Sequence, residues 1–343
     1  MKKFIFVLLV ITFQCLGAQQ PATIPLTEKD GLPDIEFYDI LEDDQNYIWL
    51  AADRGLYRYN GRSFTHFVHP NQKGNAVFGI QQDSSNRIWC NNIAGQFFYV
   101  ENQKLKLFID LGSLLKGQLA EFIITEDEII VLPGSDIIRV DLHTQAVLEK
   151  SNSERAVIGS VKRDSNSFLF SKENYLIKAD SCFIAIDSLK FDPLFNPSVQ
   201  TNLLKRVYIS GNEHLKLCHY HKLGQNYFYI FSIENSYYHP IQIPASLRLR
   251  TITHSFFHES EIWFSTDQGL FLCELNGNEL LLKKRLFPKK FITKVIKDRE
   301  SNYWITTKGD GILVMPNINI FEHPYDQGKL NISKLELVND ELM

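Results

Sequence analysis

The sequence repeats a degenerate pattern of about forty residues, and this period restricts the fold more than any other feature of the chain. The clearest copy leads from an acidic turn at Asp43 and Asp44 through Trp49 to Gly55. Further copies show the same tryptophan followed by a glycine, at Trp89 and Gly95, Trp263 and Gly269, and Trp304 and Gly311. A period of this length indicates one supersecondary unit stacked many times, as in solenoids and propellers.

The spacing of the anchor residues predicts seven units. Most anchors follow one another about forty residues apart, at Trp49, Trp89, Ile130, Leu169, Trp263 and Trp304. The long interval after Leu169 has room for one more unit, which we place around Leu215–Cys218 and Tyr227–Ile230. This fifth unit is the most divergent copy.

Each unit is expected to form four short strands, which in the first unit span residues 35–43, 47–52, 56–60 and 63–68. The breaks carry turn residues, and the repeated glycine stands where a tight turn needs a positive φ. One sheet cannot bury both faces alone, but a closed ring of sheets can, with the tryptophans packed between neighbours. The predicted fold is all-β: a seven-bladed β-propeller of four-stranded antiparallel blades over residues 19–328. A short turn of helix is expected within Leu111–Phe122.

Residues 1–18 have the features of a secretory signal peptide. Lys2 and Lys3 precede the apolar run Phe4–Phe13, which is too short to span a bilayer, and Leu16-Gly17-Ala18 offers small residues for cleavage. The alternative is an uncleaved anchor. We therefore expect an exported, periplasmic protein. Its net charge of −4 gives a nucleic-acid partner no electrostatic support.

The four cysteines that follow the signal peptide show no metal-ligand spacing. Cys90 and Cys273 lie in predicted strands, which favours buried thiols, whereas an oxidising compartment would permit a bridge between Cys182 and Cys218. Both states of this last pair remain open.

No known catalytic motif is present, so we predict no catalytic residue, no metal and no cofactor. The recurring acidic residues Asp43, Asp44 and Asp83 indicate structural turns rather than calcium ligands. His219 and His221 are expected on a solvent-exposed strand face. The basic residues Lys283-Lys284-Arg285 and Lys289-Lys290 are interpreted as a solvated face. The alternative for this cluster is a contact for an acidic ligand such as a uronic or sulfated sugar.

The propeller architecture places candidate ligand contacts at one mouth of the central channel. The innermost strands line this channel, and their first residues meet at the same mouth. Counting back from the anchors puts five candidate ligand-binding residues there: Glu36, Tyr38, Phe78, Arg250 and Lys290. Aromatic rings at this mouth could stack on a small molecule or an oligosaccharide, and the cations could pair with carboxylates or sulfates.

The segments Phe37–Asn60 and Ser301–Leu313, with the preceding Gly31-Leu32-Pro33, resemble the two-component regulator propeller repeat. In that family the repeats form the exported sensor region of Gram-negative histidine kinases and hybrid two-component regulators. The resemblance implies a ligand-sensing input region whose partners are downstream signalling domains or a partner protein. It also implies a later Tyr-rich β-sandwich, a transmembrane helix and a cytoplasmic kinase or DNA-binding part. The membrane would be reached only through those parts, and a homodimer is left open.

Residues 329–343 resemble the start of an eighth repeat, because Asp340-Glu341-Leu342-Met343 aligns with Asp127-Glu128-Ile129-Ile130. We therefore expect the native chain to continue past Met343; the alternative is a coincidental tail on a finished domain. Two segments compete to close the ring, Thr23–Leu26 and Ile318–His323. Two other functions remain open: an exported propeller enzyme acting on polysaccharide, and an adhesive or structural binding protein.

Overall fold

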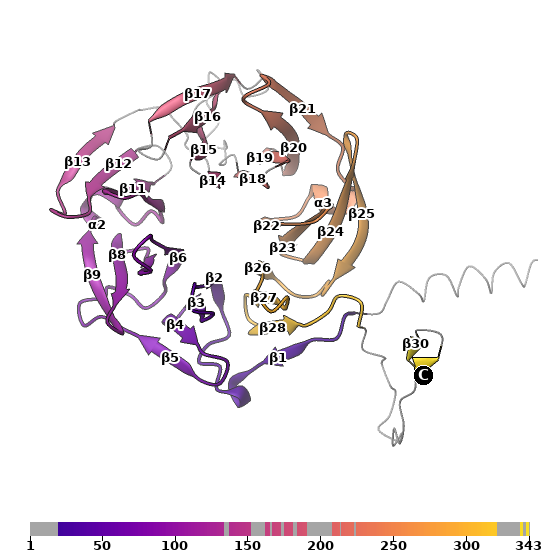
Figure 1. The fold of residues 1–343 in the computed structure, drawn as a ribbon, viewed down its shortest axis with the longest axis horizontal. Coiled ribbons are helices and arrows are strands. Elements are labelled where there is room, and N and C mark those ends of the chain that lie inside the picture. The colour runs from indigo at the N-terminus through magenta and orange to yellow at the C-terminus, as the bar shows by residue number, and fades with distance from the viewer. Residues whose placement is uncertain are drawn as a thin grey trace, which may run out of the picture.

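The computed structural model describes residues 20–133, 137–151, 162–164, 167–172, 175–180, 184–190, 208–212, 214–222, 224–320, 337–338 and 341–342. Within these residues, seven four-stranded antiparallel sheets stand in a ring around a central channel (Figure 1). This confirms the predicted seven-bladed β-propeller. The predicted signal peptide (residues 1–18, with Cys15) and Cys182 lie outside the described residues.

Each of the first six blades is built from four consecutive strands, numbered from the channel outward. Blade 1 contains β2 (Phe37–Glu42), β3 (Ile48–Ala52), β4 (Gly55–Tyr59) and β5 (Phe64–Phe67). Blade 2 contains β6 (Phe78–Gln82), β7 (Ile88–Asn91), β8 (Gln96–Glu101) and β9 (Lys104–Asp110). Blade 3 contains β10 (Glu121–Ile124), β11 (Glu128–Leu132), β12 (Ile137–Asp141) and β13 (Val147–Ser151).

The following blades repeat this order. Blade 4 contains β14 (Lys162–Asp164), β15 (Ser167–Lys172), β16 (Tyr175–Ala179) and β17 (Ala185–Lys190). Blade 5 contains β18 (Tyr208–Gly211), β19 (Lys216–Lys222), β20 (Gln225–Ser232) and β21 (Tyr237–Ile241). Blade 6 contains β22 (Ile252–His258), β23 (Glu261–Thr266), β24 (Gly269–Asn276) and β25 (Glu279–Leu286). Short helical turns occur at η1 (Glu28–Asp30), α2 (Gly112–Leu115) and α3 (Ala245–Arg248), and α2 confirms the turn of helix predicted within Leu111–Phe122.

Blade 7 is closed by a strand from the other end of the propeller. Its inner strands are β26 (Ile292–Lys297), β27 (Tyr303–Thr307) and β28 (Ile312–Met315). Its outer strand is β1 (Ile24–Leu26), which pairs antiparallel with β28 so that Leu26 lies opposite Ile312 (Figure 1). Of the two competing closures, the N-terminal one is therefore correct. A separate two-stranded hairpin joins β29 (Leu337–Val338) to β30 (Glu341–Leu342).

Three blades share an acid–tryptophan clamp. In blade 1, Asp43 Oδ2 accepts a hydrogen bond from the indole nitrogen of Trp49 (2.6 Å), while Oδ1 accepts from the backbone nitrogens of Gln45 and Tyr47. Equivalent indole bonds of 2.7 Å join Trp89 to Asp83 and Trp304 to Asp298. One carboxylate thus satisfies both a turn and a buried indole. This confirms the prediction that Asp43 and Asp83 are structural.

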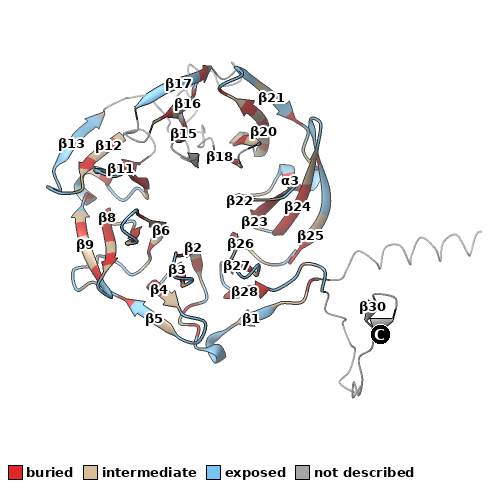
Figure 2. Cartoon of the chain, in the orientation of Figure 1, coloured by how far each residue is buried: buried red, intermediate tan, exposed pale blue. Residues whose placement is uncertain are grey.

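The core lies between the blades. Each anchor tryptophan packs among residues of the next blade, as Trp49 does against Ile88 and Phe98 and Trp304 does against Ile40. Figure 2 shows the result: middle strands such as β3, β11 and β23 are buried, and outer strands such as β5, β13 and β17 are largely exposed. The innermost strands β2, β6 and β22 are mostly of intermediate exposure. A strand that is buried on both faces needs apolar side chains at nearly every position, as in Ile48–Ala52.

His219 and Cys218 in blade 5 are both buried. His219 is buried rather than solvent-exposed, because its ring is stacked between Tyr208 (5.0 Å between ring centroids) and Phe228 (5.0 Å). Burial, with a smaller effect of His221, lowers the pKa of His219 to about 3, so the ring is neutral at pH 7. The Cys218 thiol is free and buried, so the structure gives no support to a bridge with Cys182.

Candidate functional site

Antiparallel connectivity gives the ring two different faces. Connections between the second and third strands of a blade, and those between blades, lie on one face, which carries the predicted channel mouth. Connections between the first and second strands lie on the opposite face, where the acid–tryptophan clamps are found; we call it the turn face. A candidate site must therefore be assigned to one face before its residues can be grouped.

Three of the five predicted residues meet at the channel mouth, where they form what we call the mouth cluster with Asp53. The Tyr38 hydroxyl lies 3.2 Å from Glu36 Oε2 and 3.1 Å from Asp53 Oδ1. The Tyr38 ring stacks on Phe78 of the next blade with 4.7 Å between centroids. Burial raises the pKa of Tyr38, and the Asp53 and Glu36 carboxylates raise it further, so this hydroxyl remains a neutral donor.

A β-bulge presents Tyr38 at this position. In β2, Phe37 pairs with Ala52 but Asp39 pairs with Ala51, so Tyr38 has no partner in the ladder. The innermost strands of blades 6 and 7 have the same irregularity, at Thr253 and Thr293. Bulges re-aim side chains and locally end the regular pairing. The repeat thus places a bulged residue at the same level of the channel in at least these three blades.

Next to Tyr38 in β2, Asp39 connects three blades through one ion pair and one hydrogen bond. Lys294 Nζ of blade 7 lies 2.5 Å from Asp39 Oδ1 of blade 1, and Asp39 Oδ2 accepts from the backbone nitrogen of Ile80 in blade 2 (2.8 Å). Both side chains of the pair are largely buried. A buried pair with its remaining oxygen satisfied holds its partners in one geometry. It therefore fixes blade 1, which carries Tyr38, against both neighbours.

Arg250 and Lys290 make other contacts. The Arg250 guanidinium donates from Nε to the backbone oxygen of Ser246 (3.2 Å). Lys290 Nζ forms an ion pair with Asp310 Oδ1 (3.0 Å) in a loop of blade 7. No contact joins either cation to the mouth cluster among the residues the structure describes. Their role as ligand contacts remains a prediction.

Sequence reasoning did not identify Asp53, Asp39 or Lys294. Asp53 lies in an Asp-Arg-Gly turn, where an acidic residue is explained by turn chemistry alone. Asp39 and Lys294 occupy the same place in β2 and β26, one residue past the bulge, so aligning the repeats would have paired them. The signal was thus present as opposite charges at equivalent repeat positions.

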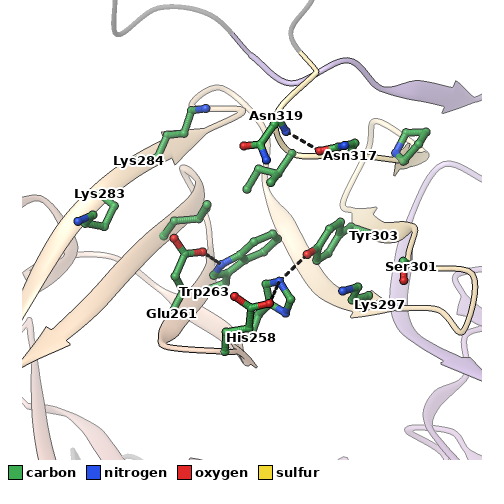
Figure 3. Close-up of a pocket in the computed structure, with 14 residues that line it drawn as sticks. His258, Glu261, Trp263, Lys283, Lys284, Lys297, Ser301, Tyr303, Asn317 and Asn319 are labelled. Atoms are coloured by element: carbon green, nitrogen blue, oxygen red, sulfur yellow. Dashed lines mark hydrogen bonds and ion pairs between the residues drawn. The ribbon is translucent and has the colours of Figure 1, made fainter. Parts of the chain in front are cut away.

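A concavity of about 530 Å³ lies between blades 6 and 7 on the turn face (Figure 3). We call it the seam pocket. Its centre holds the stacked rings of Trp263 and Tyr303, 4.8 Å apart, and the Tyr303 hydroxyl lies 2.8 Å from His258 Nε2. Lys283 and Lys284, two members of the basic cluster predicted from sequence, line it from β25. Lys283 is exposed and Lys284 is half-buried, so the solvated-face interpretation and the ligand-contact alternative both stay predictions.

Neither a metal-binding cluster nor a membrane-spanning helix is found among the described residues. Where the chain is described, no group of three or more His, Cys, Asp or Glu side chains could hold a metal ion. The same part of the chain contains no helix with the length and apolar character needed to cross a membrane.

The fold is similar to that of known propellers, whereas the sequence is distant from them. No family model and no curated protein matches the chain. Virginiamycin B lyase from Staphylococcus aureus superposes with a TM-score of 0.62 at 13% identity, covering 86% of this chain and 98% of the lyase. The extracellular domain of a proposed hybrid two-component system from B. thetaiotaomicron gives a TM-score of 0.60 at 14% identity, covering 87% of this chain. At these identities the likeness shows the fold alone.

A further extracellular domain from B. thetaiotaomicron, also of a proposed hybrid two-component system, gives a TM-score of 0.60 at 15% identity. The chain spans 39% of the first of these domains and 42% of the second. Structural neighbours of this propeller thus include both an enzyme and extracellular domains of signalling systems.

Proposed function

We propose that the chain is an exported ligand-sensing propeller, the input region of a two-component signalling protein, and that it recognises a carbohydrate at the mouth cluster. The observation that supports this most is the stacked Tyr38–Phe78 pair beside Glu36 and Asp53 at the channel mouth. The resemblance of the first and last repeats to the two-component regulator propeller, and the extracellular signalling domains among the structural neighbours, support the same role.

The chemistry of the mouth cluster favours a neutral oligosaccharide. Aromatic rings offer an apolar face for the C–H face of a sugar ring, and carboxylates accept hydrogen bonds from sugar hydroxyls. Glu36 and Asp53 make an acidic sugar unfavourable, because like charges at short distance repel. The cations Lys290 and Lys294 are held in ion pairs with Asp310 and Asp39.

A propeller enzyme is the second candidate, since the chain covers 98% of virginiamycin B lyase. A lyase or hydrolase needs an acid and a base within reach of one bond. Glu36 and Asp53 flank a single hydroxyl, so they are the residues to test. The raised pKa of Tyr38 argues against this hydroxyl as the base near neutral pH.

Binding to neutral oligosaccharides tests the proposal. We expect the secreted chain to bind at least one of cellohexaose, laminarihexaose, xylohexaose or mannohexaose by titration calorimetry, without cleaving it. Tyr38→Ala or Phe78→Ala should weaken that binding about tenfold or more, because each removes half of the stacked pair. The matched control is Phe64→Ala, which breaks the Tyr59–Phe64 stack (4.6 Å) away from the channel mouth.

Two results would count against this proposal. An unchanged affinity in Tyr38→Ala would show that the ligand binds outside the mouth cluster. Cleaved product that disappears in Glu36→Gln or Asp53→Asn would favour the enzyme over the sensor.

A further inference from the structure

The seam pocket offers a chemistry that differs from that of the mouth cluster. It lies on the turn face, between β25 of blade 6 and β26 of blade 7, and its volume of about 530 Å³ is in the range of small-ligand sites (Figure 3). Lysines enter it from two opposing walls: Lys283 and Lys284 come from β25, and Lys297 comes from the end of β26. An anion between these walls would be attracted from both sides.

The charged side chains that line the pocket differ in whether they already have an ion-pair or hydrogen-bond partner. Lys283 pairs with Glu274 (2.8 Å), and Glu261 Oε2 accepts from the Trp263 indole (2.8 Å). Lys297 lies 5.5 Å above the Tyr303 ring, and the described residues provide it with no ion pair. Burial lowers the pKa of Lys284, with Glu261 opposing the shift. An added carboxylate would supply Lys297 with a counter-ion and would approach Lys284, which already interacts with Glu261.

The remaining walls suit a hydroxylated ligand with one apolar face. Leu272 and Ile318 supply apolar surface, while Ser301, Asn317 and Asn319 supply neutral hydrogen-bonding groups. Asn317 Oδ1 already accepts from the backbone nitrogen of Asn319 (2.8 Å), which leaves its amide nitrogen for a ligand oxygen. Glu259 and Glu261 line the pocket beside the three lysines, so the small excess of positive charge matches a singly charged sugar better than a polyphosphate.

One wall of the pocket is the segment through which the chain leaves the ring. Pro316–Asn319 follow β28 directly, and Figure 3 shows Asn317 and Asn319 above the Trp263–Tyr303 stack. The next residue, Ile320, accepts a hydrogen bond from the backbone nitrogen of Ala22 (2.6 Å), just before β1. A ligand in the pocket would therefore touch blade 6, blade 7 and the segment that leaves the ring at once.

We propose that the seam pocket is a second binding site, for an anionic saccharide of the hexuronate type, whose carboxylate lies between Lys284 and Lys297 and whose binding orders the segment Pro316–Ile320. The ordering step rests on the proposed sensor function, because it gives the ring a ligand-dependent contact with the chain that follows. The binding step stands independently of the mouth cluster, which lies on the opposite face.

The test is calorimetric titration of the secreted chain with di- and trigalacturonate at low ionic strength. Lys284→Met and Lys297→Met keep the aliphatic stem and remove the charge, so each should weaken binding about tenfold with little change in thermal stability. The matched control is Lys308→Met, since Lys308 stands at 6.0 Å from the Phe291 ring on the other face. This variant should bind as the wild type does.

Three outcomes would overturn the site. Wild-type affinity in both Lys284→Met and Lys297→Met would remove its basis, as would an equal loss in Lys308→Met. Sodium sulfate binding as tightly as trigalacturonate would mean an anion site without saccharide recognition. Amide hydrogen exchange tests the coupling: exchange at residues 317–320 should slow with trigalacturonate, and unchanged exchange would exclude the ordering step.

Tyr38→Ala separates the two proposals. It should leave galacturonate binding at the seam pocket intact while weakening neutral-sugar binding at the channel mouth about tenfold or more. A parallel loss of both would show that the ligands share one site and would overturn the second one.

Discussion

Blades 1, 2 and 7 differ from blade 3 in how the same turn is held. In the former, one aspartate binds both the turn backbone and the tryptophan indole. In blade 3 the equivalent turn residue is Thr125, whose Oγ1 accepts from the Glu128 backbone nitrogen (3.0 Å), and the anchor is the fully buried Ile130. The blade geometry is the same, with four antiparallel strands in each case.

The comparison shows that the acidic turn followed by tryptophan encodes a polar clamp, and that the blade fold forms without it. Apolar packing suffices between blades 3 and 4, where Ile130 and Leu132 lie in one buried cluster with Phe168 and Phe170. Burying an apolar side chain needs no partner of defined geometry, whereas a buried indole N–H does. Blades without the clamp can therefore diverge in sequence while keeping their place in the ring.

The largest expected effect comes from deleting β1, the outer strand of blade 7, which is one of the three blades with an acid–tryptophan clamp. Starting the chain at residue 28 removes the outer strand of blade 7 and exposes the edge of β28, where Ile312 and Leu313 are now buried. We expect a loss on the order of 5 kcal/mol in the free energy of unfolding, measured by urea titration. Starting the chain at residue 20, which keeps β1 and its neighbouring contacts, is the control. An unchanged midpoint would mean that the clamp of blade 7 holds the ring without closure.

A direct test of the comparison sets Asp83→Ala against Thr125→Ala. Asp83→Ala leaves the buried Trp89 indole and two turn nitrogens without their acceptor, which should cost roughly 2–4 kcal/mol in unfolding free energy. Thr125→Ala removes one neutral hydrogen bond and should cost about 1 kcal/mol or less. Equal losses in urea titrations would show that the clamp adds nothing beyond the turn.

The smallest effect concerns pH and blade 5, which resembles blade 3 in containing no tryptophan. Because the pKa of His219 is about 3 in the folded state and about 6.5 when unfolded, only the unfolded chain takes up this proton between these values. Stability contributed by the neutral ring is therefore lost as the pH falls below about 6.5, by about 1.4 kcal/mol per pH unit. His219→Phe keeps the stack with Tyr208 and Phe228 and should lose about 2 kcal/mol less than wild type between about pH 7 and pH 5.

The control for this last experiment is His143→Gln, which replaces a histidine whose side chain is 75% exposed and leaves the blade 5 stack intact. Urea midpoints at the two pH values give the comparison. Parallel changes in wild type and His219→Phe would refute the buried neutral ring.

The fold was predictable because its determinants are periodic. The strands of blade 1 were placed within about two residues, since turns at Asp43 and Gly55 interrupt its apolar runs. Gly55 and Gly95 have the positive φ that was expected (131° and 83°). The burial of His219 was not predictable, because it depends on Tyr208 and Phe228, which belong to the most divergent unit.

The candidate sites were only partly predictable. Tyr38 and Phe78 lie one period apart, so their proximity follows from the repeat. Asp310, the partner of Lys290, lies in a loop whose path the repeat does not specify. Predicting the seam pocket would have required the path of Pro316–Asn319 after the last blade. The repeat pattern carries no information about a segment that leaves the ring.

The pairing of β1 with β28 has a consequence for how the chain is made. The strand synthesised first waits for a partner synthesised near the end of the chain, so the ring cannot close until almost every blade has emerged. Until then β1 and the last blade each present an unpaired edge, the state most exposed to aggregation. Once formed, the same pairing joins the two ends of the ring, so neither can fray without the other.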